Sequence, residues 1–181
     1  MIFLRWRNEL RRFFLASCVF LAVAGCQDEG ISHDWHRIDP PVPAPEFTLN
    51  RLEGPAVSLG ELKGRVVILE FWATWCAPCR SSLPSLEAIA KRYRDRHVQV
   101  LLVNVAEPPG PVRAWLEDRY EAAVVLLDRG GEVSDRYGVS SIPHLVVIDQ
   151  QGRMVWSHQG YGGGLERNLS LILDQLLAEH A

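Results

Sequence analysis

Two cysteines separated by two residues, Cys76 and Cys79, are the residues of this sequence best suited to chemistry. They follow the apolar run 66–72, which predicts a strand buried on both faces, and a helix is expected to start at about residue 76. At the start of a helix, unpaired N–H groups and the positive end of the helix dipole stabilise a thiolate. Since only the thiolate attacks a disulfide, we expect Cys76 to be the attacking and more exposed thiol and Cys79 to resolve the mixed disulfide.

Three other interpretations of this pair remain open. A zinc site needs two further ligands at suitable spacing, and the sequence has no second cysteine pair with this spacing. A purely structural disulfide would close too short a loop to stabilise the fold much. A peroxidatic cysteine would be expected three residues after a threonine, whereas Thr74 stands two residues before Cys76 and Ala73 occupies the third position.

The first 25 residues are predicted to be an export signal. Their opening stretch is basic, and the apolar run 13–24 that follows is shorter than the roughly 20 residues that span a bilayer as a helix. The stretch 23–26 (Val-Ala-Gly-Cys) resembles a bacterial lipobox, which implies that Cys26 is lipidated and becomes the new N-terminus. An ordinary signal peptide or a short uncleaved anchor is the alternative, and Arg11-Arg12 leaves open export by the twin-arginine route.

Composition limits the possible partners. The chain has 181 residues, is 48% hydrophobic and carries a formal charge of −3, which is typical of a folded domain rather than a disordered chain. Without a basic block, nucleic-acid binding is not expected. Removal of the signal would take Cys18 with it, and lipidation would cap Cys26. In an oxidising compartment Cys76 and Cys79 would then have only each other as disulfide partners.

The rest of the sequence predicts a tether followed by one α/β domain. Residues 26–45 contain four prolines and are expected to form a tether, and the domain is expected to cover residues 46–181. Two short strands around a Gly-Pro turn predict an N-terminal β-hairpin, at 47–49 and 57–59. Further strands are expected at 66–72, 98–105, 123–127, 144–149 and 153–158, and helices at 76–94, 112–121, 132–137 and 165–179. This alternation predicts three layers, with helices on both faces of a central mixed sheet.

The segment 66–80 (Val-Val-Ile-Leu-Glu-Phe-Trp-Ala-Thr-Trp-Cys-Ala-Pro-Cys-Arg) resembles the active-site segment of the thioredoxin superfamily. More narrowly, it resembles the extracytoplasmic, membrane-tethered thiol-disulfide oxidoreductases of the TlpA/ResA/CcmG type. The similarity extends over roughly residues 45–175 and includes the segment 137–143 (Tyr-Gly-Val-Ser-Ser-Ile-Pro). It implies a thioredoxin-like fold with a central helix–strand insertion at 112–127.

The resemblance also implies roles for individual residues. Pro143 matches the cis-proline that faces the disulfide in thioredoxin folds, and the backbone of Ile142 is implied to pair with substrate as an added strand. Beside the cysteines, Trp75, Ala77 and Pro78 are implied to contact substrate.

Glu70 is unusual because it is a carboxylate in the middle of an apolar strand. If charged and unpaired there, it would cost several kcal/mol, so burial should raise its pKa and leave it able to exchange a proton with Cys79. Thioredoxins carry a buried acid at the matching position. An edge-facing or salt-bridged Glu70 is the alternative. Some ResA-like proteins have a glutamate three residues after the second cysteine, where this chain has Ser82, so a substrate preference identical to that of ResA is not implied.

The expected function is thiol–disulfide exchange by a lipid-anchored protein that faces the periplasm of a bacterial cell. The resemblance implies reduction of disulfides in exported proteins, such as the haem-site cysteines of apocytochrome c, and re-reduction by a transmembrane donor of the CcdA/DsbD kind. Neither a cofactor nor a metal is expected. The alternatives are a DsbA-like oxidase and a non-catalytic lipoprotein that uses the fold to bind a partner such as a haem or metal chaperone.

Overall fold

The computed structural model describes residues 30–32, 34–117 and 119–179, so the predicted signal peptide and Cys26 lie outside the described residues. Along the chain the elements are β1 (Trp35–Pro43), β2 (Thr48–Arg51), β3 (Val57–Ser58), a 3-10 helix (Leu59–Leu62), β4 (Val66–Trp72), α1 (Ala77–Arg92), β5 (Val98–Val105), α2 (Pro109–Leu116), β6 (Val124–Asp128), α3 (Glu132–Arg136), β7 (His144–Ile148), β8 (Arg153–Gln159) and α4 (Leu165–Ala178). Among the described residues, no helix has the length and apolar character to cross a membrane.

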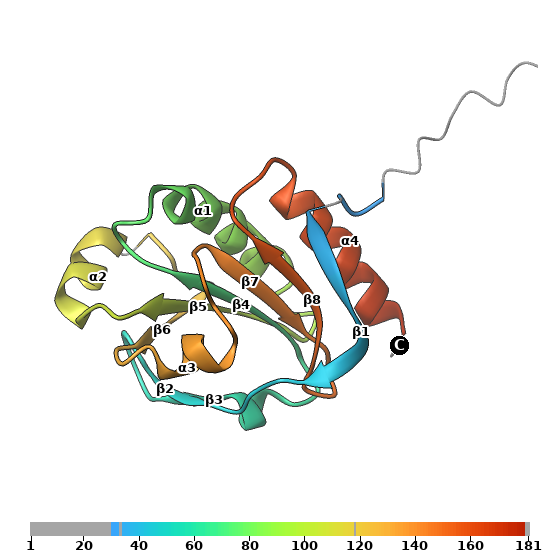
Figure 1. Ribbon diagram of the computed structural model, residues 1–181, viewed down its shortest axis with the longest axis horizontal. Coiled ribbons are helices and arrows are strands. Elements are labelled where there is room, and N and C mark those ends of the chain that lie inside the picture. The colour runs from blue at the N-terminus through green and yellow to red at the C-terminus, as the bar shows by residue number, and fades with distance from the viewer. Residues whose placement is uncertain (1–29, 33, 118, 180–181) are drawn as a thin grey trace, which may run out of the picture. The chain divides into compact units, whose positions relative to one another are not determined.

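The strands form one mixed sheet in the order β1-β8-β7-β4-β5-β6-β2-β3. Strands β4, β5 and β6 run parallel, whereas β7, β8 and β1 each pair antiparallel with their neighbours. Helices α1 and α4 cover one face of the sheet and α3 covers the other (Figure 1). The predicted thioredoxin-like fold is therefore confirmed, including the N-terminal β2–β3 hairpin and the inserted α2 and β6.

Strand β4 is buried at every position, because helices cover both faces of the sheet here. Side chains alternate across a strand, so Ile68 and Trp72 pack toward α1 and α4, while Leu69 and Phe71 pack toward α3. By the same alternation, Glu70 points to the face that α1 covers. The strand thus places one carboxyl group beneath the helix that carries the cysteines.

The predicted tether needs correction, because part of it belongs to the domain. Residues Trp35–Pro43 form β1, which pairs antiparallel with β8, with an irregular register between Arg37 and Val42. Prolines lack the N–H that a central strand donates, so the sequence 39–43 argued against a strand. Strand β1 lies at the edge of the sheet, where proline and bulges are tolerated.

The inserted helix also differs from its predicted bounds of 112–121. It starts earlier, at Pro109, because proline is favoured in the first turn of a helix. It ends at Leu116, because Glu117 takes up a left-handed backbone conformation with φ 43°. The predicted positions of β4, α1, β5, β7, β8 and α4 agree with the structure to within a few residues at each end.

Candidate active site

The cysteine pair lies at the start of α1, just after the loop that follows β4. Cys76 is the N-cap residue of α1, and its Sγ accepts a hydrogen bond from the backbone N–H of Cys79 at 3.2 Å. Pro78 lies in the first turn, where its missing N–H costs no helical hydrogen bond. The two cysteines form a disulfide in this structure. After reduction, the same N–H would point at the Cys76 sulfur and stabilise it as a thiolate.

The two sulfurs differ in their access to solvent. Cys76 is 4% exposed and Cys79 is fully buried, so the order of exposure is the expected one although Cys76 is itself largely covered. The neighbouring Trp75 is 70% exposed, which is the largest exposure among the big apolar side chains of the described residues. An apolar surface therefore lies directly beside the more accessible sulfur.

A backbone carbonyl from the segment before β7 faces Cys76. The O atom of Ile142 lies 3.7 Å from Cys76 Sγ, and the Ile142–Pro143 peptide bond is cis, as the resemblance implies. The disulfide sulfur carries no hydrogen, so only the reduced thiol can donate to this carbonyl. Ile142 is half-buried and Pro143 is buried. The structure thus brings together Cys76, Ile142 and Pro143 from distant parts of the chain.

Glu70 is buried next to α1, as expected. It is 2% exposed and lies between Leu102 of β5 and Leu145 of β7, so it does not face an edge of the sheet. Burial raises the pKa of Glu70 to about 8, and a hydrogen bond with Ser82 offsets part of that increase. Its Oε1 lies 2.7 Å from Ser82 Oγ. A carboxyl group with this pKa can hold or release a proton near neutral pH.

A second acid at the site was not predicted from the sequence. Glu107 follows β5 and accepts hydrogen bonds from Thr74 N at 2.8 Å, Thr74 Oγ1 at 2.5 Å and Asn104 Nδ2 at 2.7 Å. Because Thr74 stands two residues before Cys76, Glu107 fixes the segment that leads into the disulfide. The only sequence signal for Glu107 was its position just after a buried parallel strand. Functional residues in α/β folds gather at the carboxyl ends of such strands.

A further unpredicted acid ties α1 to the insertion. Glu87 of α1 accepts hydrogen bonds from the backbone N–H groups of Glu121, Ala122 and Ala123, at 2.9–3.3 Å. Its side chain also lies 3.3 Å from Lys91 Nζ. Burial alone would raise the pKa of Glu87, but these N–H groups and Lys91 more than offset it, so the pKa is lowered. The helix that carries Cys79 is thereby held to the loop before β6.

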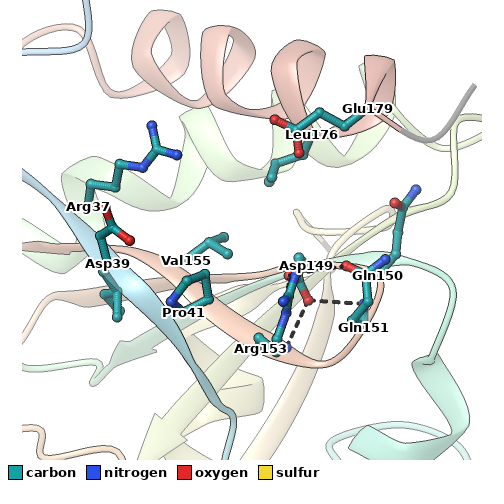
Figure 2. A pocket seen from close by; sticks show the side chains of 11 residues that line it. Arg37, Asp39, Pro41, Asp149, Gln150, Gln151, Arg153, Val155, Leu176 and Glu179 are labelled. Carbon is teal, nitrogen blue, oxygen red and sulfur yellow. Dashed lines mark hydrogen bonds and ion pairs between the residues drawn. The ribbon is translucent and has the colours of Figure 1, made fainter.

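A separate cavity of about 100 Å³ lies against β1 and the β7–β8 turn (Figure 2). In β7, Ile148 pairs with Val67 near the start of β4, whereas His144 pairs with Phe71 near its end, so this cavity lies at the opposite end of the sheet from the cysteines. The Asp149 carboxylate in its wall already accepts hydrogen bonds from Gln151 N, Arg153 N and Arg153 Nε. The Asp149 carboxylate therefore stabilises the β7–β8 turn.

Comparison with known proteins identifies the family of this chain. Residues 41–157 match the AhpC/TSA family. The thiol-disulfide oxidoreductase ResA of Halalkalibacterium halodurans is 36% identical over 118 residues, which are 65% of this chain and 66% of that protein, just under two thirds of its length.

Two solved structures share the fold. One is a thiol:disulfide interchange protein of Chlorobium tepidum assigned as DsbE, with a TM-score of 0.72 and 30% identity over 77% of this chain and 99% of the other. The second is the exposed lipoprotein thioredoxin Etrx1 of Streptococcus pneumoniae strain TIGR4, with a TM-score of 0.64 and 33% identity over 73% of this chain and all of the other. The chain therefore belongs to the AhpC/TSA family, as a thioredoxin-like member of the thiol-disulfide oxidoreductase type.

Proposed function

We propose that the protein is a disulfide reductase of the bacterial cell envelope, which acts on disulfides of exported proteins. The observation that carries the proposal is the position of Cys76, whose sulfur caps α1 and accepts the N–H of Cys79 at 3.2 Å. This arrangement lowers the pKa of a thiol and favours the attacking thiolate. The relatives described as thiol-disulfide oxidoreductase and thiol:disulfide interchange protein support the reaction class.

Two exchange steps would transfer one pair of electrons. The Cys76 thiolate attacks one sulfur of the substrate disulfide, forms a mixed disulfide and releases the other substrate sulfur as a thiolate. Glu70 first releases its own proton to water; Cys79 then loses its proton to the Glu70 carboxylate and attacks the Cys76 sulfur. This attack forms the Cys76–Cys79 disulfide and releases the second substrate sulfur. The substrate is reduced by two electrons and the enzyme is oxidised by two.

The surroundings of the disulfide suggest how a substrate would be held. The exposed Trp75 and the half-buried Ile142 flank Cys76, and Ala77 and Pro78 form the turn between the two cysteines. A substrate segment would pair with the Ile142 backbone as an added strand, with Pro143 beneath it.

The same proposal includes a membrane anchor and a redox partner. Lipidation of Cys26 would hold the domain at a membrane on the periplasmic side, and the similarity to an exposed lipoprotein thioredoxin supports this. A transmembrane donor of the CcdA/DsbD kind would return the disulfide to the dithiol. Apocytochrome c haem-site cysteines are one substrate that fits, because each pair forms a disulfide within an exported chain.

The proposal is tested by trapping substrates with variants of the full chain in which one cysteine of the Cys76–Cys79 pair is replaced. Cys79→Ser should accumulate mixed disulfides with exported proteins, because the resolving thiol is gone, and Cys76→Ser should trap none. The reverse pattern would show that attacker and resolver are exchanged. If neither variant traps a protein and the wild type reduces no insulin disulfide, the fold serves partner binding instead.

The direction of electron flow is tested by the redox potential of the pair. A reductase should have a potential well below that of DsbA, which is about −120 mV. A potential close to the DsbA value would make the protein an oxidase.

A further inference from the structure

One hydroxyl group links Glu70 to the cysteine pair. Ser82 is 1% exposed, and its Oγ lies 2.7 Å from Glu70 Oε1 and 2.8 Å from the carbonyl O of Cys79. Both distances are those of good O–H···O hydrogen bonds. Ser82 therefore stands between the buried acid and the backbone of the resolving cysteine.

A serine hydroxyl has a single hydrogen and can donate it to one acceptor at a time. If Glu70 is ionised, both neighbours of Ser82 are acceptors, and one of the two short contacts has no proton in it. If Glu70 is protonated, its O–H donates to Ser82 while Ser82 donates to the Cys79 carbonyl, and both contacts are hydrogen bonds. The distances fit the protonated acid, in agreement with the raised pKa of Glu70.

In residues 30–32, 34–117 and 119–179, the other elements around Glu70 offer its carboxylate no charged partner. Its neighbours in the sheet are Leu102 and Leu145, and α4 contributes apolar side chains to the core on this face: Leu165, Leu169, Ile172 and Leu173. The ion pairs with α4 are formed by Arg92 at the end of α1 with Glu166, and by Arg96, which follows α1, with Asp174.

On α1 itself, the buried Glu87 is occupied by the backbone of residues 121–123, and Arg80 is exposed. Within the described part of the chain, the hydrogen-bond partner recorded for the Glu70 carboxyl group is the hydroxyl of Ser82. Ser82 is therefore the donor placed to stabilise the Glu70 carboxylate.

We propose that Ser82 is a positioning residue that controls the ionisation of Glu70 during turnover. When Glu70 releases its proton to water, the Ser82 hydroxyl turns its hydrogen from the Cys79 carbonyl to the carboxylate. When Glu70 takes the proton of the Cys79 thiol, the hydrogen of Ser82 returns to the carbonyl. No electrons pass through Ser82, and one proton moves from Cys79 Sγ to Glu70. The part of this inference that concerns turnover rests on the proposed function.

The test compares Ser82→Ala with Ser81→Ala, the matched change at the exposed neighbouring serine. In the full chain with the Cys76–Cys79 disulfide intact these two cysteines do not titrate, so the assigned carboxyl ¹³C signal of Glu70 reports its ionisation without interference from their thiols. Loss of a hydrogen bond to an ionised group should raise the pKa of Glu70 by about one unit in Ser82→Ala and leave it unchanged in Ser81→Ala. In the protein that carries a preformed mixed disulfide on Cys76, Ser82→Ala should make release of the substrate at pH 7 about tenfold slower. The pH–rate profile should shift to higher pH by about one unit.

A second pair of variants separates the hydroxyl from packing. Ser82→Thr and Ser82→Val have the same shape, but only Ser82→Thr keeps the hydroxyl, so it should keep the wild-type pKa of Glu70 while Ser82→Val should not. Equal Glu70 titrations in the two variants, or an unshifted titration in Ser82→Ala, would overturn the role of Ser82. If the wild type reduced no disulfide, the proposed function would fail, whereas the NMR titration would still decide this inference.

Discussion

Replacing Glu70 with glutamine should make the protein more stable and less active. The carboxyl group ionises near pH 4.5 in an unfolded chain but near pH 8 when buried in β4. Folding at neutral pH therefore forces it to take up a proton. The stability of the wild type is highest, with respect to this group, below pH 4.5 and falls as the pH rises through 8.

The size of the effect follows from the pKa difference. Each pH unit between the two pKa values costs about 1.4 kcal/mol, so the stability difference between Glu70→Gln and the wild type should grow by about 3 kcal/mol between pH 5 and pH 7. Glutamine keeps an oxygen for Ser82 and does not titrate. Urea unfolding of the full chain with the disulfide intact measures this difference at each pH. Exposed Glu121→Gln serves as the control.

A parallel pH dependence in the wild type and Glu70→Gln would refute this reasoning, because it would mean that Glu70 titrates alike in the folded and unfolded chains. The same substitution should slow disulfide reduction, since glutamine cannot accept the Cys79 proton. An unchanged pH–rate profile would remove Glu70 from proton transfer.

Three further substitutions test the surroundings of the disulfide. Glu87→Gln should destabilise the protein by about 2–4 kcal/mol at pH 7 and by less near pH 3, because the lowered pKa of Glu87 gives stability above pH 4.5 that is lost as the pH falls. Denaturant unfolding at pH 7 and pH 3 measures this loss of stability. A loss below about 0.5 kcal/mol at pH 7 would contradict the prediction. Glu107→Gln leaves one acceptor oxygen for three hydrogen-bond donors, so the segment around Thr74 should become more mobile and insulin reduction should slow about tenfold. An unaltered rate would show that the hydrogen bonds of Glu107 do not matter for the reaction. Trp75→Ala should change stability by less than about 0.5 kcal/mol but raise the KM for protein disulfides, and an unchanged KM would exclude Trp75 from substrate binding.

Local patterns were enough to predict the centre of the fold. Strand β4 and helix α1 were predicted because a continuous buried run and an apolar helical stripe are both visible within a short window. The cysteine pair and Glu70 lie in or beside these segments, so they were predicted as well. The cis-proline Pro143 lies far away in the sequence, before β7, and it was predicted only through the resemblance to thioredoxin folds.

What was missed depends on partners that are distant in the sequence. Glu107 and Glu87 bond to backbone and side-chain groups about 33–36 residues away, and such pairings leave no local pattern. Strand β1 was missed because its prolines oppose a strand, and only its place at the edge of the sheet makes them harmless.

The alternation of side chains along β4 restricts where insertions and deletions can be tolerated in this chain. A one-residue deletion between Val66 and Glu70 would turn the acid away from α1 and toward the apolar cluster around Phe71 and Tyr137. A one-residue insertion between Glu70 and Cys76 would keep the acid in place but shift the sulfur along the helix axis. Viable descendants of this sequence should therefore keep the six-residue interval while their loops grow or shrink.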